Sequence, residues 1–396
     1  MKNKRVLIPV LALLVVAGGG LTSCQQSSLV APAQISSLTE TSNLLTNFGD
    51  PNLKRLADKL HHSDTELTHI LIAGDSHTAA DFLSGQLRTM FQRRYGDGGP
   101  GFISPLAIPG NRYSNVGYSS VTGWRLESSR RTINSEFTLG GNIATPVTDN
   151  NLVRISATGG ETELQAQALY LAKDNASLWL QNQTVSLMNT HGLWALSPAV
   201  SVPGSFLLSL SGKAQLGGVW LTVRQPHGVI VSALGSNGAQ ISILNKWPAD
   251  WPGTLKMLSP DMVVLAYGTN EAFNGTLSAD IYRQELTIQI RKIRQAVPDA
   301  VIMLIGPGSS IQHKDGTRCL QRQSAALTMV IQIQKQVAET EHTLFWDWFS
   351  FMGGACSIDH WAKEGKARPD LVHLQAEGYR EVADGVWKSL MAKLED

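Results

Sequence analysis

Three cysteines, few charged residues and no excess of either sign distinguish this sequence of 396 residues. Charged residues make up 16% of the chain, and the formal net charge at pH 7 is +1. A nucleic-acid-binding protein would normally carry a basic face or tail, so this balance argues against that class. The 36 glycines follow no regular period, which excludes a collagen-like fibre. With 43% hydrophobic residues, the chain is predicted to be globular with a sizeable core.

Long hydrophobic runs are also missing, and the most apolar stretch lies at the N-terminus. Basic residues at positions 2, 4 and 5 precede an apolar segment over residues 6–16, which is too short to span a bilayer. This pattern predicts a signal peptide over residues 1–24. Its end, Leu21-Thr22-Ser23-Cys24, resembles the bacterial lipobox, in which the cysteine is lipidated and becomes the new N-terminus. An ordinary secretory signal with an incidental cysteine is the alternative.

The residues after Cys24 extend this interpretation. Gln25, rather than Asp, follows the cysteine, which by analogy with bacterial lipoproteins implies a periplasmic protein anchored by lipid to the outer membrane. Residues 25–48 are expected to be a polar tether. In an oxidising periplasm Cys319 and Cys356 could form a disulfide, with two free thiols as the alternative. No cluster supplies the further ligands of a typical zinc site, so no metal is expected.

From about residue 50 onward, apolar runs of strand length alternate with helical patterns. The expected strands cover residues 69–73, 229–233, 262–266, 300–305 and 343–346. The expected helices cover residues 78–94, 279–295, 320–339 and 376–394. Near-continuous apolar strands between amphipathic helices predict an α/β fold with a parallel sheet covered on both faces.

A different texture interrupts this rhythm over residues 105–227. Short alternating or β-branched runs are separated there by Gly, Asn, Asp and Ser, which predicts an inserted, β-sandwich-like domain. The α/β domain is therefore expected to be discontinuous, comprising residues 49–104 and 228–396.

Four distinctive loops lie where ligand sites of open parallel α/β sheets are found, beyond the carboxyl ends of the strands or just ahead of a helix. In chain order they are Gly74-Asp75-Ser76-His77, Gly235-Ser236-Asn237-Gly238, Gly268-Thr269-Asn270-Glu271 and Asp370-Leu371-Val372-His373. Each loop alone is a weak signal, and four ordinary polar turns are the bland interpretation. Their order and their placement relative to strands and helices make the set specific.

In this order the loops resemble the serine, glycine, asparagine and histidine blocks of the SGNH (GDSL-like) hydrolases, over residues 65–104 and 228–396. The resemblance implies a flavodoxin-like, three-layer core. The extended first block, residues 74–82, together with residues 96–102, resembles the peptidoglycan O-acetylesterases of Gram-negative bacteria. That family also inserts a β-rich, carbohydrate-module-like domain after its first block.

The resemblance assigns roles to individual residues. Ser76 is expected to be the nucleophile, with His373 as its base and Asp370 orienting the imidazole. The oxyanion hole would comprise the Ser76 N–H, the Gly238 N–H and the side-chain amide of Asn270. Gly235 is the alternative donor in the second block.

Two residues depart from the pattern, and five aromatic residues have two interpretations. The third block usually ends in Asp, where this chain has Glu271. His77 follows the nucleophile and is expected to be a structural helix-start residue bonded to backbone rather than a catalytic one. Core packing is preferred over a sugar-binding cleft for a set of tryptophans, namely Trp247, Trp251, Trp346, Trp348 and Trp361.

The resulting hypothesis is a serine esterase that removes O-acetyl groups from peptidoglycan glycan strands, at the C6 hydroxyl of muramic acid. No organic cofactor is expected. An O-acetyltransferase with the same triad is the main alternative, because triad and oxyanion hole would look identical. A lipase or thioesterase, and a non-catalytic glycan-binding lipoprotein, are the others.

Overall fold

The computed structural model describes residues 44–159, 163–248, 250–313 and 318–395. The expected signal peptide, the lipidation residue Cys24 and most of the expected tether lie outside these described residues. Among the helices that are described, none is both long and apolar enough to cross a membrane.

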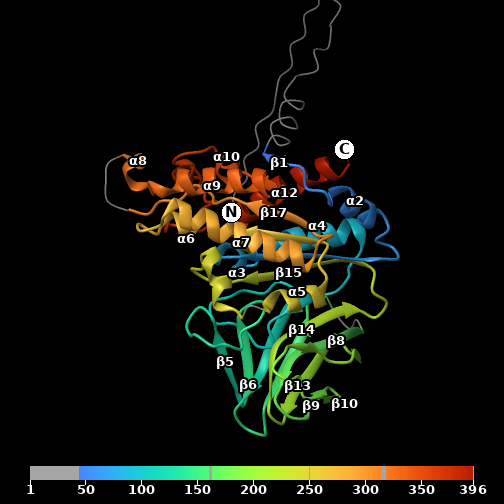
Figure 1. Cartoon of the computed structure of the whole chain (residues 1–396). Helices are drawn as coiled ribbons and strands as arrows, with labels where there is room; N and C mark the ends of the chain where they lie inside the picture. Colours follow the sequence, from blue (N-terminus) through green and yellow to red (C-terminus); the bar gives the residue numbers. More distant parts are fainter. Residues whose placement is uncertain (1–43, 160–162, 249, 314–317, 396) are drawn as a thin grey trace, which may run out of the picture.

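A six-stranded sheet forms the centre of the α/β part (Figure 1). Its strands, in spatial order, are β1 (Leu45–Asn47), β18 (Leu344–Trp346), β17 (Val301–Ile305), β16 (Met262–Ala266), β2 (Leu67–Gly74) and β15 (Gly228–Gly235). Five of them are parallel, and only β1 runs antiparallel to its neighbour. The five apolar runs expected as strands all occur in this sheet, whereas β1 was not expected.

Helices cover both faces of this sheet because successive side chains of each buried strand point to opposite faces. In β2, Leu71 and Ala73 belong to one apolar cluster, while Ile70 and Ile72 belong to another. The first cluster includes residues of α5 (Trp251–Leu258), α7 (Ala279–Ala296) and α9 (Ala326–Thr340). The second includes residues of α2 (Leu53–His61), α4 (Leu83–Tyr95) and α12 (Ala376–Leu394). Six short helices complete the set among the described residues: α3 (Ser76–Ala79), η1 (Ile241–Lys246), α6 (Thr269–Ala272), α8 (Cys319–Arg322), α10 (Trp348–Phe351) and α11 (Ser357–Lys363).

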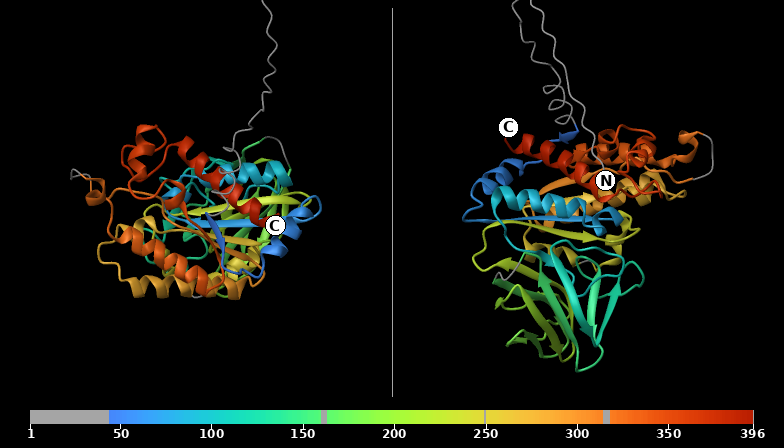
Figure 2. Two further views of the ribbon diagram at one scale, coloured as in Figure 1. Left: turned by 90° about the horizontal axis from the view of Figure 1, so that it is seen from above. Right: turned by 180° about the vertical axis from the view of Figure 1, so that it is seen from behind.

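Two antiparallel sheets lie beyond the six-stranded sheet and its helices (Figures 1 and 2). The five-stranded one has the order β10 (Gln183–Leu187), β9 (Ala176–Leu180), β13 (Ser205–Ser211), β7 (Leu152–Ala157) and β4 (Val116–Thr122). The seven-stranded one has the order β11 (Ala195–Leu196), β8 (Leu164–Ala172), β14 (Ala214–Val223), β6 (Asn142–Pro146) and β5 (Trp124–Ser128), with β12 (Val200–Val202) on β8 and β3 (Gly101–Ile103) on β14. Side chains from both sheets, such as Phe206 and Leu216, meet in one cluster.

The seven-stranded sheet also packs against the α/β part with its other face. In β8, Ala168 and Tyr170 point into the cluster between the two antiparallel sheets, whereas Leu169 and Leu171 join the cluster that contains α5 and α7. Because successive side chains of β8 point to opposite faces, this one strand contributes to both apolar clusters. The antiparallel sheets and the helices are therefore in continuous apolar contact.

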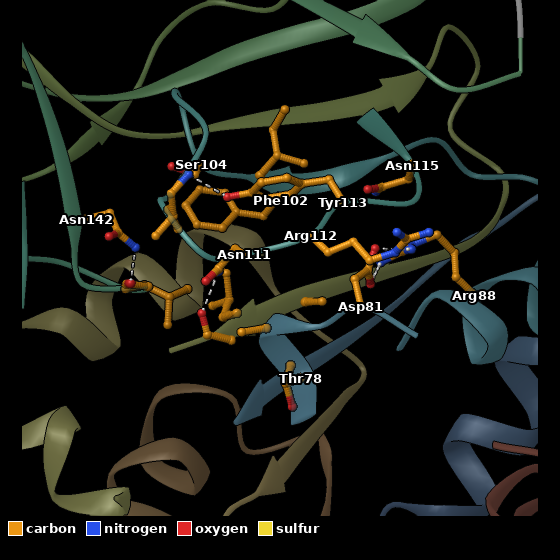
Figure 3. A pocket seen from close by; sticks show the side chains of 18 of the residues that line it. Thr78, Asp81, Arg88, Phe102, Ser104, Asn111, Arg112, Tyr113, Asn115 and Asn142 are labelled. Atoms are coloured by element: carbon orange, nitrogen blue, oxygen red, sulfur yellow. Dashed lines mark hydrogen bonds and ion pairs between the residues drawn. The ribbon is translucent and has the colours of Figure 1, made fainter. Parts of the chain in front are cut away.

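One expected helix is interrupted, and the interruption links the two parts of the chain. The helix expected over residues 78–94 divides into α3 and α4, because Asp81 between them adopts a left-handed conformation with φ +47°. Its buried carboxylate accepts hydrogen bonds from the Ser114 N–H and Oγ at 2.7 and 2.6 Å and forms an ion pair with Arg88 at 3.3 Å. Figure 3 shows Asp81 and Arg88 pointing toward each other.

The remaining expectations concern helix 320–339, the cysteines and the tryptophans. That helix divides into α8 and α9 around Gln323. A disulfide joins Cys319 at the start of α8 to Cys356, with 5.9 Å between their Cα atoms. The tryptophans at positions 247, 251, 346, 348 and 361 are all buried, so packing and not a sugar-binding cleft accounts for them.

Asp81→Ala should destabilise the protein by about 3–5 kcal/mol, because it leaves the buried Arg88 guanidinium without its charge partner. Urea unfolding monitored by circular dichroism measures the change. The matched control is Glu395→Ala, which removes an ion pair with Arg94 whose side chains are about half exposed, and it should alter the unfolding curve little. Equal curves for the two variants would contradict a structural role for the Asp81 ion pair.

Candidate active site

Three of the four loops begin side by side because their strands are parallel neighbours in register. Gly74 at the end of β2 is paired with Gly235 of β15 on one side and with Ala266 of β16 on the other. The loops that follow these strands therefore leave the sheet at one edge, as expected for an open parallel sheet. The fourth loop, residues 370–373, immediately precedes α12.

A chain of hydrogen bonds joins the first and fourth loops. The Nε2 atom of His373 lies 2.9 Å from the Ser76 Oγ, and its Nδ1 atom lies 3.0 Å from the Asp370 Oδ2. The two side chains of the fourth loop are about one-third exposed, 32% for His373 and 37% for Asp370, so a substrate can reach them. A serine, an imidazole and a carboxylate in this arrangement can perform acyl transfer.

The backbone of the fourth loop turns the carboxylate toward the imidazole. Leu371 has a left-handed conformation with φ +58°, and the Asp370 Oδ1 accepts the N–H groups of Val372 at 3.0 Å and His373 at 2.9 Å. Burial acts to raise the pKa of Asp370, but these N–H groups and the His373 ring outweigh it. The net pKa lies below the ordinary value, so the carboxylate next to His373 is ionised at neutral pH.

Ser76 is the first residue of α3, and Asp75 caps this short helix. The Asp75 Oδ1 accepts the His77 N–H at 2.9 Å, while the Ala266 carbonyl accepts the Asp75 N–H at 3.3 Å. Because Asp75 is fully buried, desolvation, with a smaller contribution from the nearby Glu271, raises its pKa to about 8. This carboxyl group is therefore a largely neutral cap near pH 7.

His77 is buried next to His373, and another side chain is its hydrogen-bond partner. Its Nδ1 lies 2.8 Å from the Tyr379 hydroxyl, and its ring packs beside those of His373 and Trp348, at centroid distances of 5.3 and 5.0 Å. The expectation that backbone would hold this side chain is wrong, because the hydroxyl of α12 occupies that position. Burial, with a smaller contribution from the adjacent His373, lowers the pKa of His77 to about 3, so the ring stays neutral.

The second and third loops are tied to each other through Asn270 and Glu271. The Asn270 Nδ2 donates to the Ala239 carbonyl at 2.9 Å and to the Asp75 Oδ2 at 3.3 Å. The Asn270 carbonyl accepts the Gln240 side chain at 2.9 Å, and the Glu271 Oε1 accepts the Ile241 N–H at 2.7 Å. Glu271 is buried, which raises its pKa to about 7. The glutamate that departs from the usual block thus holds the start of η1.

The two candidate glycines of the second loop have different environments. A Cβ atom at Gly235 would lie 2.1 Å from the Ala79 N, so this glycine permits close packing of β15 on α3. Gly238 has φ +73°, and the nearest atom to its Cβ position is the Arg130 Nη2 at 4.0 Å. Packing therefore accounts for Gly235, while the backbone of Gly238 is open on one side.

Sequence reasoning missed one side chain that supports the site, Tyr379, whose hydroxyl is the partner of His77. A tyrosine on the buried stripe of the helix directly after the histidine loop is a usable signal, since a buried hydroxyl needs a hydrogen-bond partner. Among the described residues, no group of three or more His, Cys, Asp or Glu side chains is arranged to hold a metal ion.

Comparisons with known proteins identify two families along the chain. Residues 212–381 match the GDSL-like lipase/acylhydrolase family, and residues 98–201 match the N-terminal domain of peptidoglycan O-acetylesterase. A solved structure of a peptidoglycan O-acetylesterase is 32% identical in sequence, and the alignment covers 89% of this chain and 99% of that chain with a TM-score of 0.81. A search of curated protein sequences gives no match.

Two further solved structures are more distant. An acetyl xylan esterase is 21% identical over 41% of this chain and 80% of its own, with a TM-score of 0.32. The periplasmic domain of a lipopolysaccharide acetyltransferase from Salmonella ser. Paratyphi A is 13% identical over 41% of this chain and 73% of its own, also with a TM-score of 0.32. At these TM-scores neither structure bears on the function of this chain.

Asp75→Asn should reduce the loss of stability that accompanies rising pH. A carboxyl group whose pKa is raised by folding holds more protons in the folded state between its ordinary pKa and about 8, so stability falls as pH rises through that window. Asparagine keeps the acceptor for the His77 N–H and does not ionise. Denaturant unfolding at pH 6 and pH 9 measures the difference, with the exposed Asp58→Asn as control. Wild-type and Asp75→Asn proteins losing equal stability over this range would contradict the buried, neutral Asp75.

Proposed function

Since this chain belongs to the peptidoglycan O-acetylesterase family, we propose that it removes the acetyl group from the C6 hydroxyl of muramic acid by transferring it to Ser76. The hydrogen-bonded chain from Ser76 through His373 to Asp370 carries this proposal. The enzyme is a carboxylic ester hydrolase, and its own side chains supply an acid, a base and a nucleophile.

In the first half of the reaction His373 acts as a base and then as an acid. Its Nε2 accepts the proton of the Ser76 hydroxyl while the Oγ attacks the acetyl carbonyl carbon. When the tetrahedral intermediate collapses, the bond to the sugar oxygen breaks, and His373 returns the proton to that oxygen. The ionised Asp370 holds the imidazole in the required tautomer and stabilises its protonated form. Water then attacks the acetyl-serine by the same proton route and releases acetate.

The oxyanion formed during both steps would be bound by the Ser76 N–H, the Gly238 N–H and the Asn270 amide. The contacts of the Asn270 Nδ2 support this role. One of its two hydrogens is held by the Ala239 carbonyl at 2.9 Å, which fixes the amide plane. The second makes only a long contact of 3.3 Å with Asp75, a largely neutral carboxyl, so this N–H has little competition when an oxyanion forms on its side of the amide.

We also propose that the catalytic part is flavodoxin-like and comprises residues 49–104 and 228–396. The parallel strands support this, because their chain order across the sheet, from β15 to β18, is 2-1-3-4-5. Residues 105–227 would form an inserted β-sandwich-like, carbohydrate-recognising domain, supported by the two antiparallel sheets that share one cluster. The strand β3 precedes residue 105 but pairs with β14, so the join between the two domains lies near residue 100.

Action on peptidoglycan implies that the enzyme works outside the cytoplasm, and we propose that a lipid on Cys24 anchors it to the outer membrane. The lipobox-like sequence ending at Cys24 supports this. Wild-type cells grown with labelled palmitate should yield labelled protein in the membrane fraction, and Cys24→Ser should yield unlabelled, unprocessed protein. Labelling that persists in Cys24→Ser would show that the lipid is attached at another residue and would contradict the proposed anchor.

The esterase assignment predicts that Ser76→Ala lowers acetate release from O-acetylated peptidoglycan by about 10⁴-fold or more, because the acyl acceptor is lost. Its circular dichroism spectrum should match wild type, since one hydroxyl at a partly exposed helix start contributes little to stability.

Asn270→Ala should cost roughly 10²–10³ in kcat with a smaller change in KM, because the amide acts mainly in the transition state.

The same reactions decide the acceptor. Chitooligosaccharides added to wild-type enzyme should not gain acetyl groups, as followed by mass spectrometry, while free acetate accumulates. Transfer to the sugar in place of acetate release would make the chain an O-acetyltransferase with the same triad. Acetate release that persists in Ser76→Ala would remove Ser76 as the nucleophile.

A further inference from the structure

A cleft of about 320 Å³ lies next to the loop that follows β15. Three segments line it. Gly235, Ser236 and Asn237 form the part that belongs to the catalytic domain. Residues from 108–111 and from 125–132, both within the proposed inserted domain, form most of the rest, together with Asn142 of the same domain. The cleft therefore lies where the two proposed domains meet.

This cleft opens beside the nucleophile. The Ser236 N–H donates to the Gly74 carbonyl at 2.9 Å, and Gly74 is two residues before Ser76. Two trans peptide units span at most about 7.6 Å between Cα atoms, so the residue that bonds to the cleft wall, Gly74, lies within that distance of Ser76. A substrate bound with its acetyl group at Ser76 has its neighbouring groups within reach of the cleft.

The cleft is cationic although the chain as a whole is nearly neutral. Arg125, Arg130 and Arg131 line it together with one acidic residue, Glu127. Glu127 is paired with Arg125 at 3.5 Å. In the part of the chain that the structure describes, no carboxylate lies within ion-pair distance of Arg130 or Arg131. Two guanidinium groups thus face the cleft region without an internal counter-charge.

Arg130 is held next to the catalytic loops by its neighbour in sequence. Ser129 is buried, its carbonyl accepts the Lys246 Nζ at 3.0 Å and its Oγ accepts the Trp247 Nε1 at 3.1 Å. A Cβ atom at Gly141 would lie only 2.2 Å from that Oγ, so the turn is closely packed from the other side as well. This anchoring fixes the backbone of the turn, and the Arg130 Nη2 lies 4.0 Å from the Cβ position of Gly238.

We infer that Arg130, assisted by Arg131, binds a carboxylate of the glycan strand while the acetyl ester lies at Ser76. The inference rests on the proposed function and names the group that the enzyme recognises besides the ester. The N-acetylated sugars of peptidoglycan are neutral, and its carboxylates belong to the stem peptides or to lactyl groups from which the peptide has been removed. The stem peptide and the lactyl group are both attached to the muramic acid ring that carries the C6 acetyl group.

Guanidinium chemistry fits this ligand. The planar fork of an arginine donates two parallel N–H groups to a carboxylate, which fixes orientation as well as charge. With one end of the muramic acid unit held at Arg130, the C6 ester on the same ring is oriented toward Ser76. The proposed inserted domain thereby selects the glycan without touching the reacting atoms.

The test compares Arg130→Gln and Arg130→Glu with Arg224→Gln, a control that removes the same charge from an exposed site on the same domain. Four substrates are used: O-acetylated peptidoglycan with stem peptides, the same glycan stripped by an amidase, the same polymer with its carboxyls amidated, and 4-nitrophenyl acetate. Acetate or nitrophenol release gives kcat and KM for each.

Arg130→Gln should raise KM for peptidoglycan about tenfold with little change in kcat, and Arg130→Glu should raise it more, because a charge-assisted contact made in the ground state is lost or reversed. Arg224→Gln should equal wild type. The KM of wild type for the amidated polymer should equal the KM of Arg130→Gln for the native polymer. All four proteins should hydrolyse 4-nitrophenyl acetate equally. A KM effect that persists on stripped glycan assigns the lactyl carboxylate, and one confined to peptide-bearing polymer assigns the stem peptide.

Two outcomes would overturn the inference. Unchanged KM for peptidoglycan in Arg130→Glu would show that no carboxylate is bound there. Equal losses on 4-nitrophenyl acetate would mean that Arg130 supports the Gly238 loop instead. If wild type released no acetate from peptidoglycan, the proposed function would fail separately. Co-sedimentation of Ser76→Ala and Ser76→Ala/Arg130→Glu with insoluble peptidoglycan would still decide the binding role, with the double variant expected in the supernatant.

Discussion

The approach of three strand ends around Gly74 determines where every catalytic group can lie. A Cβ atom at this position would be 2.1 Å from the Thr78 Oγ1 and 2.7 Å from the Ala266 carbonyl, so only a glycine lets β2 end in contact with both α3 and β16. That contact fixes the start of α3, and with it Ser76. It also brings Asn270 within hydrogen-bond distance of Asp75. The fourth loop then places His373 within hydrogen-bond distance of the Ser76 hydroxyl, whose position is already fixed.

Burial favours the neutral form of most titratable groups around the site, whereas Asp370 keeps its negative charge. Asp75, Glu271 and His77 are enclosed, and in each case desolvation shifts the pKa toward the neutral form. Asp370 is partly exposed and accepts several N–H groups, which keeps it ionised. The carboxylate that stays ionised therefore faces the imidazole that must carry a positive charge in the transition state. The buried groups contribute hydrogen bonds without competing for that charge.

The sequence predicted the features that depend on local pattern, and missed those that depend on contacts between distant segments. Apolar runs such as 262–266 matched their strand because full burial in a parallel sheet leaves a near-continuous hydrophobic signal. The division of helix 78–94 could not be predicted, since Asp81 turns out of the helix to meet Ser114, 33 residues further along the chain. The same holds for the partner of His77, because Tyr379 is supplied by the last helix. The proximity of Arg130 to Gly238 could not be predicted for the same reason, as nothing near Arg130 in sequence points to that loop.

The alternation along β8, with Leu169 facing the helices and Ala168 facing the other antiparallel sheet, has a consequence for how such proteins can evolve. A domain joined by a flexible linker can be exchanged for another with different specificity, because no side chain depends on the partner. Here a foreign replacement would have to reproduce an apolar surface matched to α5 and η1. New preferences for glycan are therefore expected to arise by substitution in loops such as 108–111 and 128–132, which change the cleft and leave the buried contacts intact. Sequence variation among relatives should concentrate in those loops, while the β8 positions vary only in ways that conserve volume.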